Sequence, residues 1–471
     1  MKQSSVRVDI ETVKRFDKPG PRYTSYPTAV EFTEDVGEAA YRTKLAEANA
    51  LGSEPLSLYA HLPFCEHRCL FCGCHVVITP HMPVAEKYMA YLKREISMLA
   101  DHLPDRRRVV QMHWGGGTPT YFAPAQLEDL FHHFQRYFTF VEGAEIALEV
   151  DPRVTTRDHL EVLSDLGFNR LSLGVQDLTP EVQVAIDRNQ THEQTVRLVE
   201  TARALGFTDG INIDLIYGLP KQEPTTFGEN LDQIIAMRPD RVAVYSFAYV
   251  PWIRGHQKKL DADTLPSPES KLELYLMAME RFLDAGYQPI GMDHFALPDD
   301  ELAVAASERR LHRNFMGYTV MPASDMIGLG ISGIGEVRHA FFQNEKKLST
   351  YYEAIDAERL PVARGYLLDR DDRIRQHVIH EIMCNFRIDK ADVRGRFGVE
   401  FDGYLADSIE RLDEVRNAGF VELDAQGLRV TPEGRLFVRN VCMAFDRYLL
   451  AKQKEKKGEA PRERPVFSRT V

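Results

Sequence analysis

The stretch HLPFCEHRCLFCGCH, residues 61–75, holds four of the six cysteines in this 471-residue chain. It follows the apolar, β-rich run LSLYAHL (56–62) directly. No signal-like apolar core opens the chain and no apolar run reaches bilayer length, so we expect a cytoplasmic protein without a membrane span. In that reducing compartment a cysteine cluster indicates metal binding or catalysis rather than disulfides. The four residues are Cys65, Cys69, Cys72 and Cys74.

Three kinds of site compete for these cysteines. A structural zinc site draws two ligand pairs from separate turns, whereas here the spacing is C-x3-C-x2-C-x-C in one loop. A thioredoxin-like redox pair uses a single C-x2-C and leaves Cys65 without a role. The third kind is an iron–sulfur cluster held by Cys65, Cys69 and Cys72. Because four-iron clusters normally take four thiolates, three would leave one iron open to another ligand.

Beyond the cysteines, the chain repeats a strand–helix unit. Six apolar, β-rich runs recur, and most are followed by one amphipathic helix, which predicts a parallel sheet in an α/β fold. Six units are too few for a closed eight-fold barrel, so an open partial barrel and a doubly wound sheet both fit the pattern. In either fold the chemistry belongs at the carboxyl ends of the strands. The expected strands are 56–62, 109–114, 145–150, 170–175, 210–218 and 241–250, and the expected helices are 84–103, 124–138, 156–167, 192–206, 225–237 and 267–286.

Three segments flank this array, which takes residues 55–364. Residues 1–54 form a leader in which prolines break PGPRYTSYPTA (19–29), so we predict an ordered extended loop there. Residues 365–450 indicate helices, one of them over 401–419, around a small hairpin, an α+β winged-helix-like domain, and residues 451–471 a polar, solvated tail. The formal net charge of −12 gives a nucleic-acid role no support, so this domain is expected to be structural or to cover the substrate.

Two further features lie at expected strand ends. WGGGTPT (114–120) closes the second strand, and its glycines allow the backbone to approach a ligand, although a tight turn gives the same pattern. Glu149 ends the third strand, where a carboxylate is often a surface residue but can also bind a ligand. Phe71 lies beside Cys72 and offers an apolar face.

The chain resembles a known family over almost its whole length. Its C-x3-C-x2-C loop after the first strand is similar to that of the radical S-adenosylmethionine (SAM) superfamily. Further motifs narrow the resemblance to the oxygen-independent coproporphyrinogen III oxidase family. These motifs are PRYTSYPTA (21–29), LYAHLPFC (58–65), HWGGGTPT (113–120), GFNRLSLGVQD (167–177), NIDLIYGLPKQ (212–222), GMDHFALPDDELA (291–303), LHRNFMGYT (311–319) and NVCMAFDRYL (440–449).

The resemblance implies a partial (β/α)6 barrel, one [4Fe–4S] cluster on Cys65, Cys69 and Cys72, and two SAM molecules. The open iron would chelate the first SAM, whose reductive cleavage gives a 5′-deoxyadenosyl radical. Cys74 would be a non-ligand. By family motif the first SAM would contact Tyr59, Gly116, Glu149 and Ile334, and the second Phe71, Gly117, Thr118, Gln176, Arg188, Asp214 and Ala248. The implied catalytic residues are Glu149, Tyr59 and Phe315. Taken alone, Arg188 also fits a solvated helix residue and Asp214 a buried cap.

The implied reaction is the oxidative decarboxylation of two propionates of coproporphyrinogen III to vinyl groups, which gives protoporphyrinogen IX in haem biosynthesis. It requires a low-potential electron donor of the flavodoxin or ferredoxin type and an electron acceptor of unknown identity, and the family suggests a monomer. A tetracarboxylate substrate needs cations, although the basic run 310–313 also fits an exposed loop face. The candidates are Arg22, Arg310, His312 and Arg313.

At three positions the chain departs from the family pattern. Well-studied bacterial members carry Phe-Gln at Phe315–Met316, Ala-His at Ala248–Tyr249 and Thr-Thr at Thr319–Val320. All three changes remove or alter polar groups on the expected substrate side, and a Gln-to-Met change loses the amide donors and the carbonyl acceptor. Two alternatives therefore stay open: a radical SAM enzyme on a related tetrapyrrole, such as a haem-degrading methyltransferase, and a non-enzymatic haem-binding protein.

Overall fold

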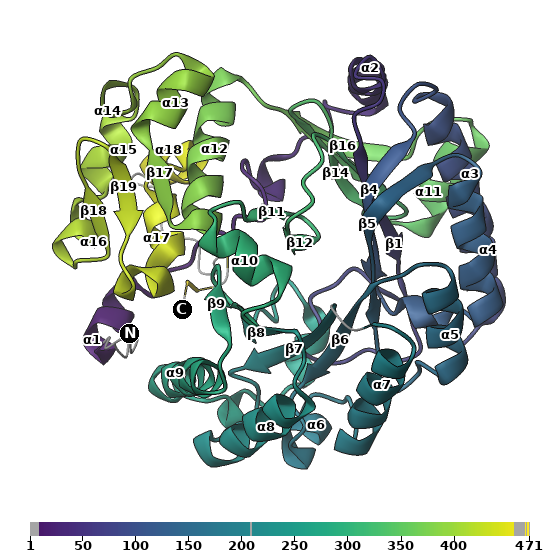
Figure 1. Ribbon diagram of the computed structural model, residues 1–471, viewed down its shortest axis with the longest axis horizontal. Coiled ribbons are helices and arrows are strands. Elements are labelled where there is room, and N and C mark those ends of the chain that lie inside the picture. The colour runs from purple at the N-terminus through teal and green to yellow at the C-terminus, as the bar shows by residue number, and fades with distance from the viewer. Residues whose placement is uncertain (1–8, 208–209, 456–466, 468, 471) are drawn as a thin grey trace.

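The computed structural model describes residues 9–207, 210–455, 467 and 469–470. Its centre is a curved twelve-stranded sheet with helices along its outer side (Figure 1). The central strands run parallel in the order β13-β1-β4-β5-β6-β7-β8. Their bounds are Met326–Leu329 for β13, Leu56–Leu62 for β1, Arg108–Gly116 for β4, Thr139–Val150 for β5, Arg170–Gln176 for β6, Ile211–Tyr217 for β7 and Arg241–Ser246 for β8.

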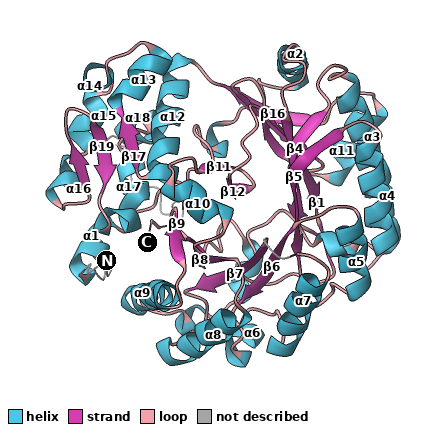
Figure 2. Ribbon diagram, viewed as in Figure 1, coloured by secondary structure: helices cyan, strands magenta, loops and turns pink. Residues whose placement is uncertain are grey.

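Strand order decides between the two topologies that the pattern left open. From β1 to β8 each parallel strand lies next to the one before it in the chain, and the crossover helices lie on the outer face (Figure 2). A doubly wound sheet reverses direction beside its first strand, whereas β1 here lies between β4 and the late strand β13. The partial barrel is therefore confirmed. Its outer helices are α3 (Met82–Asp101), α4 (Pro124–Gln135), α5 (Arg157–Asp165), α6 (Pro180–Ala185), α7 (His192–Ala204), α8 (Pro224–Met237) and α9 (Pro268–Asp284).

Both edges of the sheet are antiparallel and were not predicted. On one side β14 (Ile334–Glu336), β15 (Ala340–Asn344) and β16 (Val362–Leu367) extend the sheet beyond β13. On the other side β10 (His294–Ala296) and β9 (Gln288–Ile290) follow β8. Because β16 belongs to the sheet, the barrel ends after Leu367 rather than at residue 364.

Side chains alternate between the two faces of the sheet. In β7, Ile211, Ile213, Leu215 and Tyr217 are buried, while the intervening residues are half-buried. The buried set packs under the outer helices in one large apolar core, and the alternate set lines the concave face. The concave face therefore carries the polar side chains of the candidate site. No helix in the described ranges is long and apolar enough to cross a membrane.

The C-terminal domain begins with α12 (Arg370–Asn385) and contains the sheet β17-β19-β18. These strands are Arg387–Asp389, Gly427–Val430 and Val421–Leu423, so the predicted hairpin is present with one extra strand. The helix expected over 401–419 is instead three short helices, α14 (Phe401–Tyr404), α15 (Ala406–Arg411) and α16 (Asp413–Asn417). The chain continues through α17 (Val438–Met443) into α18 (Arg447–Glu455).

The leader packs against this C-terminal domain. Residues 17–28 form an irregular loop without a helix, as predicted, although it bends at 24–27 rather than staying extended; α1 (Ile10–Phe16) and α2 (Glu38–Asn49) were not expected. Phe16, Tyr23 and Tyr26 share one apolar core with the C-terminal helices, on the left of Figure 1. Arg439 of α17 donates to the carbonyl oxygens of Pro21 at 2.9 Å and of Gly20.

The prediction of a solvated tail is wrong for both described parts of residues 451–471. Residues 451–455 continue α18, and Arg469 forms an antiparallel bridge with Pro19 while Thr470 is buried against the leader. The intervening part of the prediction, residues 456–466, lies outside the described residues. Where described, the tail therefore helps to hold the leader.

Candidate active site

The three cysteines of the predicted cluster share one loop between β1 and α3. Cys65 lies 3.4 Å from the Thr118 hydroxyl, and the Cys74 amide donates to the Cys72 sulfur at 3.4 Å. Burial raises the pKa of Cys65 to about 11. The hydrogen bond with Thr118 lowers this pKa, whereas the neighbouring thiols of Cys72 and Cys69 raise it further. The charges of these three thiols thus act on one another across the loop.

Cys69 lies beneath two guanidinium groups. Arg153 donates to its sulfur at 3.5 Å and Arg188 at 3.6 Å, and Asp151 binds both arginines, at 2.6 Å and 3.5 Å. Cations beside a thiol favour the thiolate, which is the form that binds metals. Spacing in the sequence did not reveal Arg153 and Asp151, because they follow β5, far from the loop in the chain.

The side chains of the loop suit an iron–sulfur cluster. A four-iron cluster takes thiolates on separate irons, and an all-thiolate donor set suits iron–sulfur chemistry. The thiols with their guanidinium and amide donors therefore fit a [4Fe–4S] cluster held by Cys65, Cys69 and Cys72, with Cys74 exposed beside them.

Tyr59 and Glu149 lie on the concave face near this loop. The Tyr59 hydroxyl donates to His61 Nδ1 at 2.9 Å, because His61 Nε2–H is used on the His75 carbonyl at 2.9 Å. The Tyr59 ring stacks on His113, which lies 3.6 Å from Glu149. Burial opposes ionisation of Glu149, but His113 and the Gly116 N–H, at 2.8 Å, lower its pKa below its ordinary value. Glu149 is therefore a carboxylate at neutral pH.

The glycines after β4 are required by the packing of the protein itself. A Cβ at Gly116 would lie 2.3 Å from the His61 ring, and Gly116 adopts a φ of +113°. A Cβ at Gly117 would lie 2.5 Å from the Pro63 carbonyl carbon. The tight turn that the sequence allowed is thus present, and it presents the Gly116 amide to Glu149 rather than to open space.

Gln176 and Arg188 lie together at the carboxyl end of β6. Gln176 has a φ of +67°, and its buried Oε1 has no hydrogen-bond partner within the described structure. Such an orphaned acceptor is costly in an empty site and suits a ligand that donates a hydrogen bond. Arg188 is only 6% exposed and binds Gln190 at 3.0 Å, so it is not a solvated helix residue. Both positions fit a bound SAM.

Asp214, on the concave side of β7, is hydrogen-bonded to two polar neighbours, Asn212 on β7 and Ser172 on β6. Asn212 donates to one carboxylate oxygen at 2.8 Å and Ser172 to the other at 3.1 Å. Burial and the charge of Glu149 raise the pKa of Asp214 to about 6, although the two hydrogen bonds lower it. The amide oxygen of Asn212 is buried without a partner in the described structure, a second acceptor available to a ligand.

The other implied SAM contacts lie on either side of the loop. Gln257 donates to the Phe71 carbonyl at 3.4 Å and the Ala248 carbonyl at 3.1 Å, which joins these two segments. Ile334 lies against Gly328, whose added Cβ would meet the Ile334 backbone at 2.5 Å. Gly328 is the register partner of Tyr59. Phe315, between β11 (His312–Asn314) and β12 (Gly317–Thr319), packs edge-on against Phe341 at 5.8 Å.

The four candidate substrate cations separate into two groups. Arg22 donates to the Ser246 carbonyl at the end of β8 at 3.0 Å, and Arg313 donates to the Arg22 carbonyl at 2.9 Å. Arg310, in contrast, is exposed and pairs with Glu308. Burial lowers the pKa of His312 to about 3, and the charge of His380 acts in the same direction, so His312 is neutral. Of the four candidates, Arg22 and Arg313 are the two that the fold brings together as cations.

One further cation was not predicted. Lys271 on α9 donates to the Phe247 carbonyl at 3.2 Å and lies over the Tyr217 ring. Burial lowers its pKa to about 8; Asp17 opposes that change, and Arg22, Arg469 and Arg439 add to it. No sequence pattern pointed to this residue, since only the fold places α9 beside the leader.

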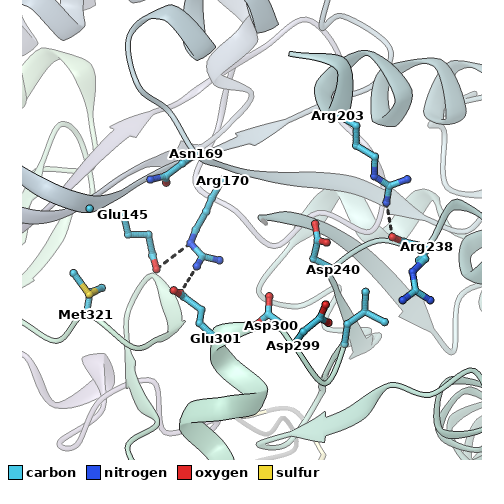
Figure 3. A pocket seen from close by; sticks show the side chains of 12 residues that line it. Glu145, Asn169, Arg170, Arg203, Arg238, Asp240, Asp299, Asp300, Glu301 and Met321 are labelled. Carbon is cyan, nitrogen blue, oxygen red and sulfur yellow. Dashed lines mark hydrogen bonds and ion pairs between the residues drawn. The ribbon is translucent and has the colours of Figure 1, made fainter. Parts of the chain in front are cut away.

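A polar cavity of about 520 Å³ lies at the other end of the barrel, where the parallel strands begin (Figure 3). Its charges pair with one another: Arg170 binds Glu145 at 3.2 Å and also Glu301, and Arg203 donates to the Arg238 carbonyl. None of the predicted site residues lines it. We therefore place the active site at the cysteine loop rather than at this cavity.

Comparison with known proteins identifies the family. The model described as the radical SAM superfamily matches residues 59–234, and the model described as the HemN C-terminal domain matches residues 368–437. The oxygen-independent coproporphyrinogen III oxidase of Escherichia coli is 44% identical over 444 residues, covering 94% of this chain and 96% of that protein. The one from Synechocystis is 40% identical over 471 residues, covering 99% of each chain.

A solved structure agrees with these sequence matches. Coproporphyrinogen III oxidase from Escherichia coli, described as a radical SAM enzyme, superposes with a TM-score of 0.90 at 43% identity and covers 95% of this chain and 100% of that one. Identity at this level over nearly the full length, with both domains matched, assigns the family. This chain belongs to the oxygen-independent coproporphyrinogen III oxidases of the radical SAM superfamily.

Proposed function

We propose that this chain is an oxidoreductase that decarboxylates two propionates of coproporphyrinogen III to vinyl groups without oxygen, giving protoporphyrinogen IX in haem biosynthesis. The curated relatives carry the name of this activity over nearly the whole chain. The observation that carries the proposal is a three-thiol loop at the carboxyl ends of barrel strands, beside a polar concave face and a pair of cations from the leader and the β11–β12 hairpin.

The cluster site is assigned to Cys65, Cys69 and Cys72. The first SAM is assigned to Tyr59, Gly116, Glu149 and Ile334. The support is that β1, β4 and β5 are adjacent, so that their side chains face one concave surface. When bound, cluster and SAM supply one electron and a carbon radical that removes hydrogen from the propionate β-carbon. Glu149, as a carboxylate, would accept hydrogen bonds from ribose hydroxyls.

A second SAM is assigned to the far side of the loop. The unpartnered Gln176 oxygen would accept a hydrogen bond, and Asp214 would accept from an amine. Arg188 would face a carboxylate, since a guanidinium can bind one through two parallel bonds. The remaining assigned contacts are Phe71, Gly117, Thr118 and Ala248.

The substrate side is assigned to Arg22 and Arg313, with Phe315 as a catalytic neighbour. Two guanidiniums held close together attract the carboxylates of a tetra-anionic macrocycle. Arg310 and His312 drop out of this assignment, because the first is paired on the surface and the second is neutral. We further propose that the chain acts as a cytoplasmic monomer with an external low-potential electron donor and a separate electron acceptor.

An anaerobic assay with SAM, a chemical reductant, an added one-electron acceptor and coproporphyrinogen III tests the proposal. The expected products are the monovinyl intermediate and then protoporphyrinogen IX, separated after oxidation to the fluorescent porphyrins. The Cys69→Ala enzyme is the matched negative control. Methylated or ring-opened tetrapyrrole would instead indicate a haem-degrading enzyme, and haem binding without SAM cleavage a carrier protein.

A further inference from the structure

Six cationic residues lie on three segments that meet at the cysteine loop, and none of them pairs with a carboxylate in the described part of the chain. Arg68 lies within the loop, three others follow β8 and two follow β15. The lysines that do form ion pairs lie elsewhere: Lys14, Lys18, Lys44, Lys93, Lys390 and Lys452. We call the six the loop rim: Arg68, Arg254, Lys258, Lys259, Lys346 and Lys347.

Hydrogen bonds hold the three segments of the loop rim together. His256, from the segment after β8, donates to the Cys72 carbonyl at 2.9 Å. His75, in the loop, donates to the Lys346 carbonyl after β15 at 2.7 Å. Burial lowers the pKa of Lys346, and the charges of Arg364 and Arg254 act in the same direction, so cations from two segments lie within electrostatic range of each other. The loop rim thus brings cations from three segments to the loop that carries Cys72.

Apolar side chains are exposed at the same place. Val184 and Ile253 are the two most exposed large hydrophobic residues among the described residues, at 68% and 53%. Ile253 precedes Arg254 in the rim segment. Val184 is on α6, whose following residue Ile186 accepts a hydrogen bond from the Leu70 amide at 2.9 Å. Exposed apolar side chains bordered by charge are typical of protein interaction sites.

We propose that the loop rim is the docking surface for an acidic electron-carrier protein that reduces the cluster site. The inference rests on the proposed function, which needs one electron from outside for each SAM cleaved. The carrier's reduced flavin or iron–sulfur centre loses one electron and the cluster gains it, with no bond made or broken. Because this chain has a net charge of −12, an acidic partner is repelled overall and needs a local cationic surface to dock.

Binding of oxidised flavodoxin, an acidic one-electron carrier, tests the proposal independently of turnover. Isothermal titration at low ionic strength compares wild type with the double variant Lys258→Glu/Lys346→Glu. The variant is expected to raise Kd about tenfold or more, since like charges at an interface cost several kcal/mol, and added salt is expected to weaken wild-type binding. The matched control is Arg108→Glu/Arg136→Glu, which reverses two unpaired cations at the opposite end of the barrel and is expected to leave Kd within about twofold.

The second measurement is the rate of cluster reduction, followed by loss of visible absorbance, with reduced flavodoxin or dithionite. K258E/K346E is expected to slow the flavodoxin reaction about tenfold while dithionite reduces it at the wild-type rate. Unchanged flavodoxin binding by K258E/K346E, or equal weakening by the control pair, would overturn the docking surface. So would a raised substrate KM with dithionite, which would assign these cations to propionates. If wild type binds flavodoxin salt-dependently but makes no decarboxylated product with dithionite, the proposed function fails and the docking surface stands.

Discussion

Arg313 donates a hydrogen bond to the main-chain carbonyl of Arg22 at 2.9 Å, which joins the β11–β12 hairpin to the leader. Arg22 in turn binds the Ser246 carbonyl at the end of β8. The nearby carboxylate is Asp293: burial raises its pKa, but His294, Arg313 and Arg22 lower it further. Two cations thus share one acidic neighbour beside the barrel strands, which leaves positive charge for an anionic substrate.

Replacing Arg22 by alanine is expected to raise KM for coproporphyrinogen III about tenfold or more, because a charge-assisted hydrogen bond contributes about 1.5–3 kcal/mol. SAM cleavage without substrate should be unchanged. Arg310→Ala is the matched control, since that guanidinium is exposed and paired with Glu308, and its KM should equal that of wild type. Equal KM values for the R22A and R310A enzymes would remove Arg22 from the substrate site.

Cys69→Ala and Cys74→Ala separate ligand from non-ligand cysteines. We expect the C69A protein to lose nearly all bound iron, since each cluster thiolate is required. The C74A protein should keep iron and visible absorbance, because Cys74 is exposed and contributes its main-chain amide to the Cys72 sulfur. Iron analysis of anaerobically purified proteins checks both. Loss of iron from C74A alone would reverse the assignment.

Protonation of Asp214 is expected to weaken SAM binding at acidic pH. Its pKa of about 6 means that the carboxylate is protonated below that pH, so affinity for the SAM amine should fall as pH drops through about 6. The D214N protein should bind SAM weakly with a flat profile. Titrations from pH 5 to 8 measure this, with Asp232→Asn, on the exposed face of α8, as the control. A wild-type profile in D214N would place the titrating group elsewhere.

The same carboxyl group also affects stability. Because its pKa in the folded protein lies above the ordinary 3.8, Asp214 stabilises the fold fully below that value and loses this contribution as pH rises through about 6. At pH 7.5 the charged group is therefore destabilising. D214N should raise Tm at pH 7.5, and the gain should shrink at pH 5. A lower Tm for D214N at pH 7.5 would contradict the sign of this effect.

Arg439 holds the leader, and Arg439→Met should free it. The change leaves the carbonyls of Gly20, Pro21 and Arg469 without their donor, and each carbonyl that stays buried without a partner costs about 1–3 kcal/mol of unfolding free energy. Urea unfolding measures the loss, and limited proteolysis should cut within residues 17–28. The control is Arg416→Ala, which removes an exposed ion pair with Asp413 in the same domain and should change the free energy of unfolding by about 0.5 kcal/mol or less. A leader that stays protease-resistant in R439M would show that its apolar contacts suffice.

Six of the seven parallel strands were predictable, because each is a β-rich run and most are followed by an amphipathic helix; the seventh, β13, has only four residues. The edge strands β9, β10 and β14–β16 were not predictable, since three- to six-residue segments carry too little pattern to distinguish them from loops. The single helix expected over 401–419 failed for a related reason: amphipathic spacing continues across turns that tertiary packing breaks.

The candidate site also contains residues that the sequence could predict and residues that only the fold reveals. Spacing alone favoured Cys65, Cys69 and Cys72, and resemblance to a family supplied the SAM contacts. Neither could show that Arg310 is paired with Glu308 or that His312 is neutral, because both outcomes depend on neighbours brought close only by folding. Lys271, Arg153 and the loop rim lacked any sequence signal for the same reason.

By itself, the sequence determined the thiol spacing, the alternation of strand and helix, and hence an α/β sheet with its chemistry at the carboxyl ends of the strands. These are local properties, set by residue type and by periods of two and 3.6 residues. Tertiary structure alone decided the strand order, the joining of the leader to the C-terminal domain, and which charges are paired. Ion pairing and burial depend on distances through space, and residues far apart in the chain meet only when the apolar core brings their elements together.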